Sequence, residues 1–229
     1  MLWLVGLLSL VWSLPQDRAD YEVQSASERV IVDGAIADWD GVAAISLTPE
    51  SAHASTGDFG ADDLAITARF LWDKEYLYVA LDWQDDKVDL KEVRRQDAVF
   101  LASDGRRRDR MYFYDYLKLA ISEQDYNYMM WVSPKLAGEG PYSWQRLLEG
   151  YDGTETAAAA PLVAARELDG RVTIELRFTW KGLRLKGKKN ETIPLALIVA
   201  DSDEPEQLLN YKAAHPKWLT WRGRLRLVE

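Results

Sequence analysis

Apolar and polar residues alternate along most of the chain, and this period-two pattern predicts β-strands rather than helices. The clearest alternation runs from Leu64 to Trp72 and again from Tyr76 to Trp83. The polar turn Asp73-Lys74-Glu75 lies between the two segments. We therefore expect a β-hairpin here, with the apolar side chains of both strands on one face.

Five other segments are also predicted to be strands. They are Tyr116 to Ile121, Tyr126 to Val132, Arg171 to Thr179, Ile193 to Ala200 and Arg224 to Val228. The fourth of these is apolar almost throughout, which is typical of a central strand buried on both faces. Short helical turns are expected only near Lys181 and Tyr142.

Two regions lack this pattern. The segment from Asp85 to Arg110 is dense in charge, and the segment from Lys135 to Ala160 is rich in Gly, Pro and Ala. Such compositions favour solvated loops over packed elements. Short strands joined by polar turns predict an all-β fold, namely a single antiparallel β-sandwich of the jelly-roll or immunoglobulin-like kind.

The N-terminal segment from Leu2 to Leu14 is uncharged and apolar. It is shorter than the ~20 residues that a membrane-spanning helix needs, and its length is typical of a secretory signal. Val11 and Ser13 are small residues suited to a cleavage site. We expect residues 1–19 to be a signal peptide and short leader, residues 20–229 to be one domain, and the protein to be secreted or periplasmic. An uncleaved anchor and a misassigned start are the alternatives.

Charge and composition exclude several classes of function. The chain of 229 residues has 37 acidic and 28 basic side chains, for a net charge of −9. An acidic surface repels phosphate backbones and anionic lipids, so we expect no nucleic-acid partner and no membrane contact after leader removal. The absence of Cys excludes disulfides, thiol nucleophiles and thiolate metal sites. No nucleophile-elbow, zinc-protease or phosphate-loop motif is present, so we expect no enzyme activity.

Six segments, in chain order, resemble those of the family 9 carbohydrate-binding modules and their DOMON-like relatives. They are Ile31 to Trp39, Leu71 to Val79, Asp115 to Ile121, Phe178 to Leu183, Ile198 to Asp203 and Trp221 to Leu227. The first, IVDGAIADW, is similar to the family's I-D-G-x-I-D-x-x-W start, and the second, LWDKEYLYV, to its L-W-D-x-x-x-L-Y-V hairpin. The resemblance implies a non-catalytic β-sandwich that binds a polysaccharide or an oligosaccharide end and serves polysaccharide catabolism.

That family clamps a sugar unit between two aromatic rings, which stack on its C–H faces. By motif position, one ring would be Trp218, just before the last strand. The other would come from Tyr112 or Tyr114, where the family has Trp. A competing alignment places Arg94 there, which cannot stack in the same way. The predicted ligand-binding residues are therefore Trp218, Tyr112 and Tyr114.

Outside the leader, the remaining tryptophans have motif or strand positions, except for Trp144. Trp39, Trp72, Trp83 and Trp180 are expected in the core, as is Trp131 within a strand. Trp144 stands in a Gly- and Pro-rich context where a core position is less assured.

No cofactor is expected, but two acidic clusters have the oxygen donors that calcium uses. They are Asp82, Asp85, Asp86 and Asp89, and Asp201, Asp203 and Glu204. A solvated acidic turn is the commoner explanation of such clusters.

The alternative from another class is a haem-binding domain. The segment from Leu81 to Asp86 resembles a strand end in haem subunits of ethylbenzene-dehydrogenase-like enzymes. Axial ligands would come from Met111, Met129, Met130 or His215. A sandwich used only for protein contacts is a third alternative.

Overall fold

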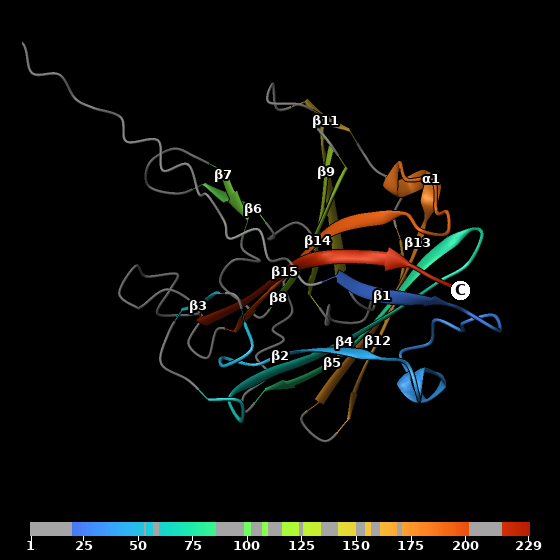
Figure 1. The fold of residues 1–229 in the computed structure, drawn as a ribbon. Helices are drawn as coiled ribbons and strands as arrows, with labels where there is room; N and C mark the ends of the chain where they lie inside the picture. The colour runs from blue at the N-terminus through green and yellow to red at the C-terminus, as the bar shows by residue number, and fades with distance from the viewer. Residues whose placement is uncertain are drawn as a thin grey trace, which may run out of the picture.

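The computed structural model describes residues 20–52, 54–56, 60–85, 99–101, 107–109, 116–123, 126–133, 142–149, 154–156, 161–168, 171–201 and 217–229. Most of these residues form strands, as Figure 1 shows. The strands are β1 Asp20–Ser25, β2 Ala44–Leu47, β3 Ala54–Thr56, β4 Leu64–Trp72, β5 Tyr76–Asp85, β6 Val99–Leu101, β7 Arg107–Asp109, β8 Tyr116–Glu123, β9 Tyr126–Ser133, β10 Tyr142–Glu149, β11 Thr154–Thr156, β12 Leu162–Leu168, β13 Arg171–Thr179, β14 Thr192–Asp201 and β15 Lys217–Leu227. The described helical turns are η1 Ile36–Trp39 and α1 Trp180–Leu183. The predicted all-β class is confirmed.

Thirteen of these strands form one continuous curled sheet. Its main order is β11-β10-β9-β8-β14-β15-β1-β4-β5-β13-β12, with β2 beside β4 and β3 beside β15. Strand β1 joins the two halves, because Asp20 to Val23 pair with β15 while Gln24 and Ser25 pair with β4. Both of these pairings are parallel, whereas every other pair among the described strands is antiparallel. The sheet is therefore joined along β1 instead of being split into two separate sheets.

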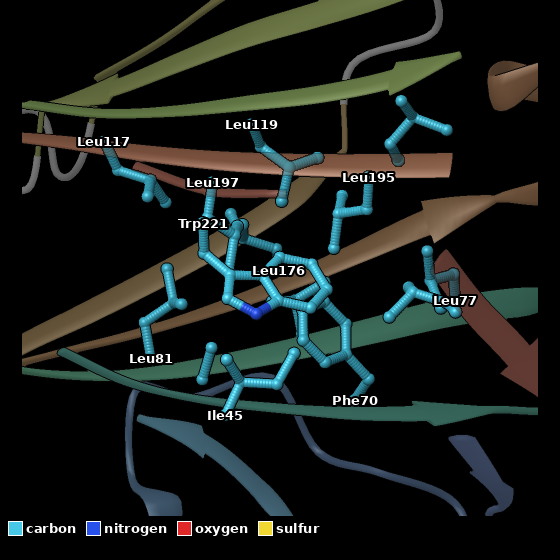
Figure 2. Packing of buried hydrophobic residues seen from close by; sticks show 14 of the residues in the cluster. Ile45, Phe70, Leu77, Leu81, Leu117, Leu119, Leu176, Leu195, Leu197 and Trp221 are labelled. Atoms are coloured by element: carbon cyan, nitrogen blue, oxygen red, sulfur yellow. The ribbon is translucent and has the colours of Figure 1, made fainter. Parts of the chain in front are cut away.

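The concave face of the curled sheet encloses the main core. Figure 2 shows side chains from β8, β14 and β15 facing side chains from β2, β4, β5 and β13. The labelled residues are Leu117, Leu119, Leu195, Leu197 and Trp221 on the first side, and Ile45, Phe70, Leu77, Leu81 and Leu176 on the second. The predicted apolar faces of the hairpin are confirmed, since alternate residues of β4 and β5 are buried here.

A second, smaller cluster covers the outer face of β4 and β5. It contains the buried side chains of Val30, Trp39, Leu71, Tyr78 and Ala80. From alternation alone, Tyr78 and Ala80 are expected on the polar face of β5. They are buried because the segment that leads from β1 through η1 packs over this face of the sheet.

Several sequence expectations are confirmed by strand pairing. The two predicted hairpins are β4–β5 and β8–β9, strand β13 has its predicted bounds, and a helical turn forms at Lys181. Strand β14 is central, between β8 and β15. Its expected burial on both faces is wrong over most of its length, because buried residues alternate with half-buried ones.

Three expectations about loops and bounds are wrong. The segment expected as a loop after Lys135 contains β10 and β11, and Tyr142 begins a strand instead of a helical turn. Strand β10 pairs with β9 over eight residues although its own sequence does not alternate cleanly. The last strand begins at Lys217, seven residues before Arg224, because it pairs with β14, β1 and β3. Strands β6 and β7 form a short pair within the charge-dense segment.

Candidate functional site

The first family-like segment is held in place by Glu175, whose side chain is fully buried. Its carboxylate accepts the backbone N–H groups of Asp33 and Gly34 at 2.8 and 2.6 Å. It also accepts the indole N–H of Trp39 at 2.7 Å. Burial raises the pKa of Glu175, and these three donors oppose the rise. The conspicuous Asp-Gly and Trp of this segment therefore serve packing.

The second and fourth segments are likewise tied to each other. The indole N–H of Trp180 donates to the Asp73 carbonyl at 2.8 Å, and the Trp180 backbone N–H donates to the Glu75 carbonyl at 3.2 Å. The Tyr78 hydroxyl donates to the Asp73 carboxylate at 2.6 Å. Gly187, with a φ of 61°, lies against the Trp180 ring, and a Cβ there would stand 2.3 Å from it. No space remains on this side of the indole for a ligand.

The tryptophans divide into two groups where the structure describes their side chains. Five are buried, as predicted for the first four: Trp39, Trp72, Trp83, Trp180 and Trp221. Trp218 differs, with 37% of its surface exposed. The strand positions of Trp131 and Trp144 are described, but their side chains are not.

Trp218 is the second residue of β15, on the face opposite the buried Leu219 and Trp221. It pairs with Thr56 of β3 on one side and with Ala200 of β14 on the other. Ala200 in turn pairs with Tyr116, the first residue of β8. Trp218 and Tyr116 therefore stand in one row across the sheet, with a single strand between them.

Strands β8 and β15 run in the same direction, because both are antiparallel to β14, so their first residues lie at the same end of the strands. The predicted site residues Tyr112 and Tyr114 precede Tyr116 by four and two positions. Both tyrosines lie outside the described residues, so the structure does not test whether they approach Trp218.

A charged cluster lies at the start of β15, on the face opposite Trp218, because Lys217 shares the face of Leu219 and Trp221. The Nζ atom of Lys217 is 2.9 and 2.7 Å from the two carboxylate oxygens of Asp63 and 3.4 Å from Asp201 Oδ2. Asp201 is fully buried, while Lys217 and Asp63 are partly exposed. Neither Lys217 nor Asp63 belongs to a motif of the sequence that predicts an interaction. A carboxylate at the end of an apolar strand, as at Asp201, was the available signal, because a buried carboxylate needs a cation or several donors.

The acidic residues proposed as calcium ligands have other partners where they are described. Asp82 forms an ion pair with Arg171 at 2.6 Å, and Asp85 Oδ2 accepts the indole N–H of Trp83 at 3.2 Å. No cluster of three or more potential metal-ligating side chains occurs among the described residues. The other candidate calcium ligands, Asp86, Asp89, Asp203 and Glu204, lie outside them.

The candidate haem ligands are not brought together by anything that the structure describes. Met129 and Met130 are consecutive residues of β9, while Met111 and His215 lie outside the described part of the chain.

Among the described residues, no helix is long and apolar enough to cross a membrane.

Solved structures share this fold, whereas no protein-family model and no curated protein matches the sequence. A family 9 carbohydrate-binding module from Caldicellulosiruptor kristjanssonii, in complex with cellotriose, is 13% identical over 92% of this chain and 94% of its own, with a TM-score of 0.54. Its glucose complex is 14% identical over 91% and 95%, with a TM-score of 0.53. A Bacteroides uniformis protein proposed to bind carbohydrate is 10% identical over 92% and 99%, with a TM-score of 0.59. The resemblance to family 9 modules is thus confirmed at the level of the fold.

Proposed function

We propose that this chain is a non-catalytic carbohydrate-binding domain that holds a polysaccharide or an oligosaccharide end against aromatic side chains. The fold that it shares with sugar-bound modules supports this proposal. The observation that carries it is the exposure of Trp218 in a chain whose other described indoles are buried. An exposed indole offers a flat apolar face for stacking, and this face matches the C–H face of a sugar.

The spacing of the strands suits a clamp between Trp218 and an aromatic ring near the start of β8, which we propose Tyr112 or Tyr114 supplies. Neighbouring strands lie ~4.8 Å apart, so β15 and β8 are separated by ~10 Å. A sugar ring in carbon contact with two aromatic faces, at ~3.5–4 Å from each, holds those faces ~7–8 Å apart. Trp218 and the start of β8 stand in one row, so aromatic rings at these two positions could accept one sugar unit between them.

The proposed context is outside the cytoplasm, after cleavage of the signal peptide near Leu14, where the domain would assist polysaccharide breakdown. N-terminal sequencing of protein isolated from its native host should find a start after residue 13. A product that retains Met1 and fractionates with membranes would contradict export.

The haem-binding alternative receives no support from the three solved structures. The visible absorption spectrum of the purified protein is a direct check, and we expect no Soret band. A Soret band that disappears in a Met130→Ala or His215→Ala variant would replace the sugar-binding proposal.

The main test is titration of the wild-type protein with cellotriose, followed by intrinsic fluorescence and calorimetry. Trp218→Ala should weaken binding about tenfold or more, which corresponds to ~1.4 kcal/mol, and leave the melting temperature nearly unchanged. Either Tyr112→Ala or Tyr114→Ala should have a similar effect. Arg224→Ala, an exposed change on the same strand, should bind normally.

Two outcomes would overturn this assignment. If Trp218→Ala binds cellotriose with wild-type affinity, the indole is not part of the sugar site. If neither cellotriose nor any glycan of a polysaccharide panel binds the wild-type protein, the sugar-binding proposal itself fails.

A further inference from the structure

A separate cavity lies between the segment that joins β1 to η1 and the beginning of β12. It has a volume of about 380 Å³, and its lining residues are Arg29, Val30, Ile31, Val32, Leu162 and Arg177. Cavities of ~300–1,000 Å³ are typical of small-molecule sites. The lining contains no residue of β14 or β15, so this cavity is distinct from the surface around Trp218.

Two side chains of the lining are apolar and unusually exposed. Ile31 is 65% exposed and Leu162 is 46% exposed. Apart from Trp218, they are the large hydrophobic residues exposed in the described part of the chain. The two come from segments far apart in the sequence, and the fold brings them to one cavity. An apolar surface assembled in this way is typical of a ligand site.

The lining of the same cavity includes two arginines, Arg29 and Arg177. Four other arginines of the described chain form ion pairs: Arg166 with Asp33, Arg171 with Asp82, Arg224 with Asp20 and Arg226 with Glu22. No described carboxylate forms an ion pair with Arg29 or Arg177. The guanidinium of Arg177 lies 4.6 Å from the centre of the Tyr76 ring, which orients it. In a protein with a net charge of −9, two guanidinium groups that have no carboxylate partner among the described residues, beside an apolar cavity, favour an anion there.

We propose that this cavity binds a small amphipathic carboxylate, in which an aryl or alkyl body carries one acid group. The body would pack on Ile31 and Leu162, and Arg29 and Arg177 would bind the carboxylate. Arginine suits this role because its planar group donates paired hydrogen bonds to a carboxylate. This site is independent of the proposed sugar site and could exist without it.

The test uses 4-phenylbutyrate as the probe, with the full chain after its leader and ligand-observed NMR or calorimetry. The wild-type protein should bind 4-phenylbutyrate and should bind the neutral 4-phenylbutanamide about tenfold more weakly. The double variant Arg29→Gln/Arg177→Gln should lose about tenfold or more in affinity for the acid but not for the amide. Ile31→Ser/Leu162→Ser should weaken both ligands.

Controls separate this site from folding and from the sugar site. Arg224→Gln removes an ion-paired arginine elsewhere and should bind the acid normally. Trp218→Ala should also bind it normally, and each variant should retain the wild-type circular dichroism spectrum.

The proposal is overturned if the acid does not bind, if acid and amide bind equally, or if the double arginine variant keeps wild-type affinity. Loss of binding in Trp218→Ala would place the ligand at the other site and would also overturn it. If the protein dimerises through Leu162, as shown by a Leu162→Asp monomer, and does not bind the acid, the face is an interface between copies.

Discussion

Trp180 and Trp218 both lie in family-like regions, yet their surroundings are opposite. The indole N–H of Trp180 is hydrogen bonded to Asp73, and Gly187 closes on the ring. Trp218 lies on the outer face of β15 with more than a third of its surface exposed. The comparison shows that an aromatic residue in a motif can serve packing or binding, and only its three-dimensional surroundings distinguish the two roles.

Two buried carboxylates also differ in their surroundings. Glu175 accepts three neutral N–H groups and belongs to a closed packing unit with Trp39. Asp201 instead faces the ammonium group of Lys217, which is partly exposed on the face of β15 opposite Trp218. The first carboxylate is compensated by buried donors, whereas the second is compensated by a cation that reaches solvent.

The largest effect is expected from Trp180→Ala. Removing this buried ring should lower the free energy of unfolding by about 3–5 kcal/mol, because it leaves a cavity and frees the Asp73 carbonyl. Denaturant unfolding followed by far-UV circular dichroism measures the change. Trp218→Ala is the matched control and should unfold within about 0.5 kcal/mol of the wild type. Equal losses in the two variants would show that both rings are structural.

Glu175→Ala should have the next largest effect, with a loss of about 3 kcal/mol or more. The substitution leaves the N–H groups of Asp33, Gly34 and Trp39 without their acceptor, and each buried unsatisfied donor costs about 1–3 kcal/mol. Thermal unfolding measures the loss. Sugar affinity in the folded protein should stay at the wild-type value, and a selective loss of affinity would mean that this region belongs to the site.

The pH dependence of stability should show the state of Glu175. Its pKa is raised above its ordinary value of 4.5, so the folded protein binds more protons than the unfolded chain in the range above that value. The protonated group therefore contributes stability at acid pH, and this contribution is lost as pH rises through the folded-state pKa. Comparing the wild type with Glu175→Gln across this range isolates the effect. The stability of the wild type relative to the variant should fall with rising pH. A difference that rises with pH would mean that the three N–H donors outweigh burial.

Asp63→Asn should have the smallest effect on folding, at most about 1 kcal/mol, because the ion pair with Lys217 is partly solvated. The same variant should leave cellotriose binding unchanged, because Lys217 and Trp218 point to opposite faces of β15. Asp82→Asn, which removes the Arg171 ion pair, is the control and should also leave sugar affinity unchanged. A several-fold loss of sugar affinity in Asp63→Asn but not in Asp82→Asn would show that the cluster contacts the sugar.

The sequence by itself determined the strands whose side chains alternate. Strands β4, β5, β8, β9 and β13 were predictable because a two-residue period is a local property that survives in any sheet with one buried face. The same alternation predicted the buried faces around Phe70 and Leu81. The order of the motifs predicted the shared fold and selected Trp218 as a candidate ligand-binding residue.

Only the tertiary structure decided the features that depend on distant partners. Strand β10 exists through its pairing with β9, and β1 joins the halves of the sheet by pairing with two strands far from it in the sequence. Tyr78 is buried because the segment containing Trp39 covers it, and Lys217 meets Asp63 across 154 positions. Local periodicity contains no information about such contacts, because their free energy arises only when the folded sheet brings both partners together.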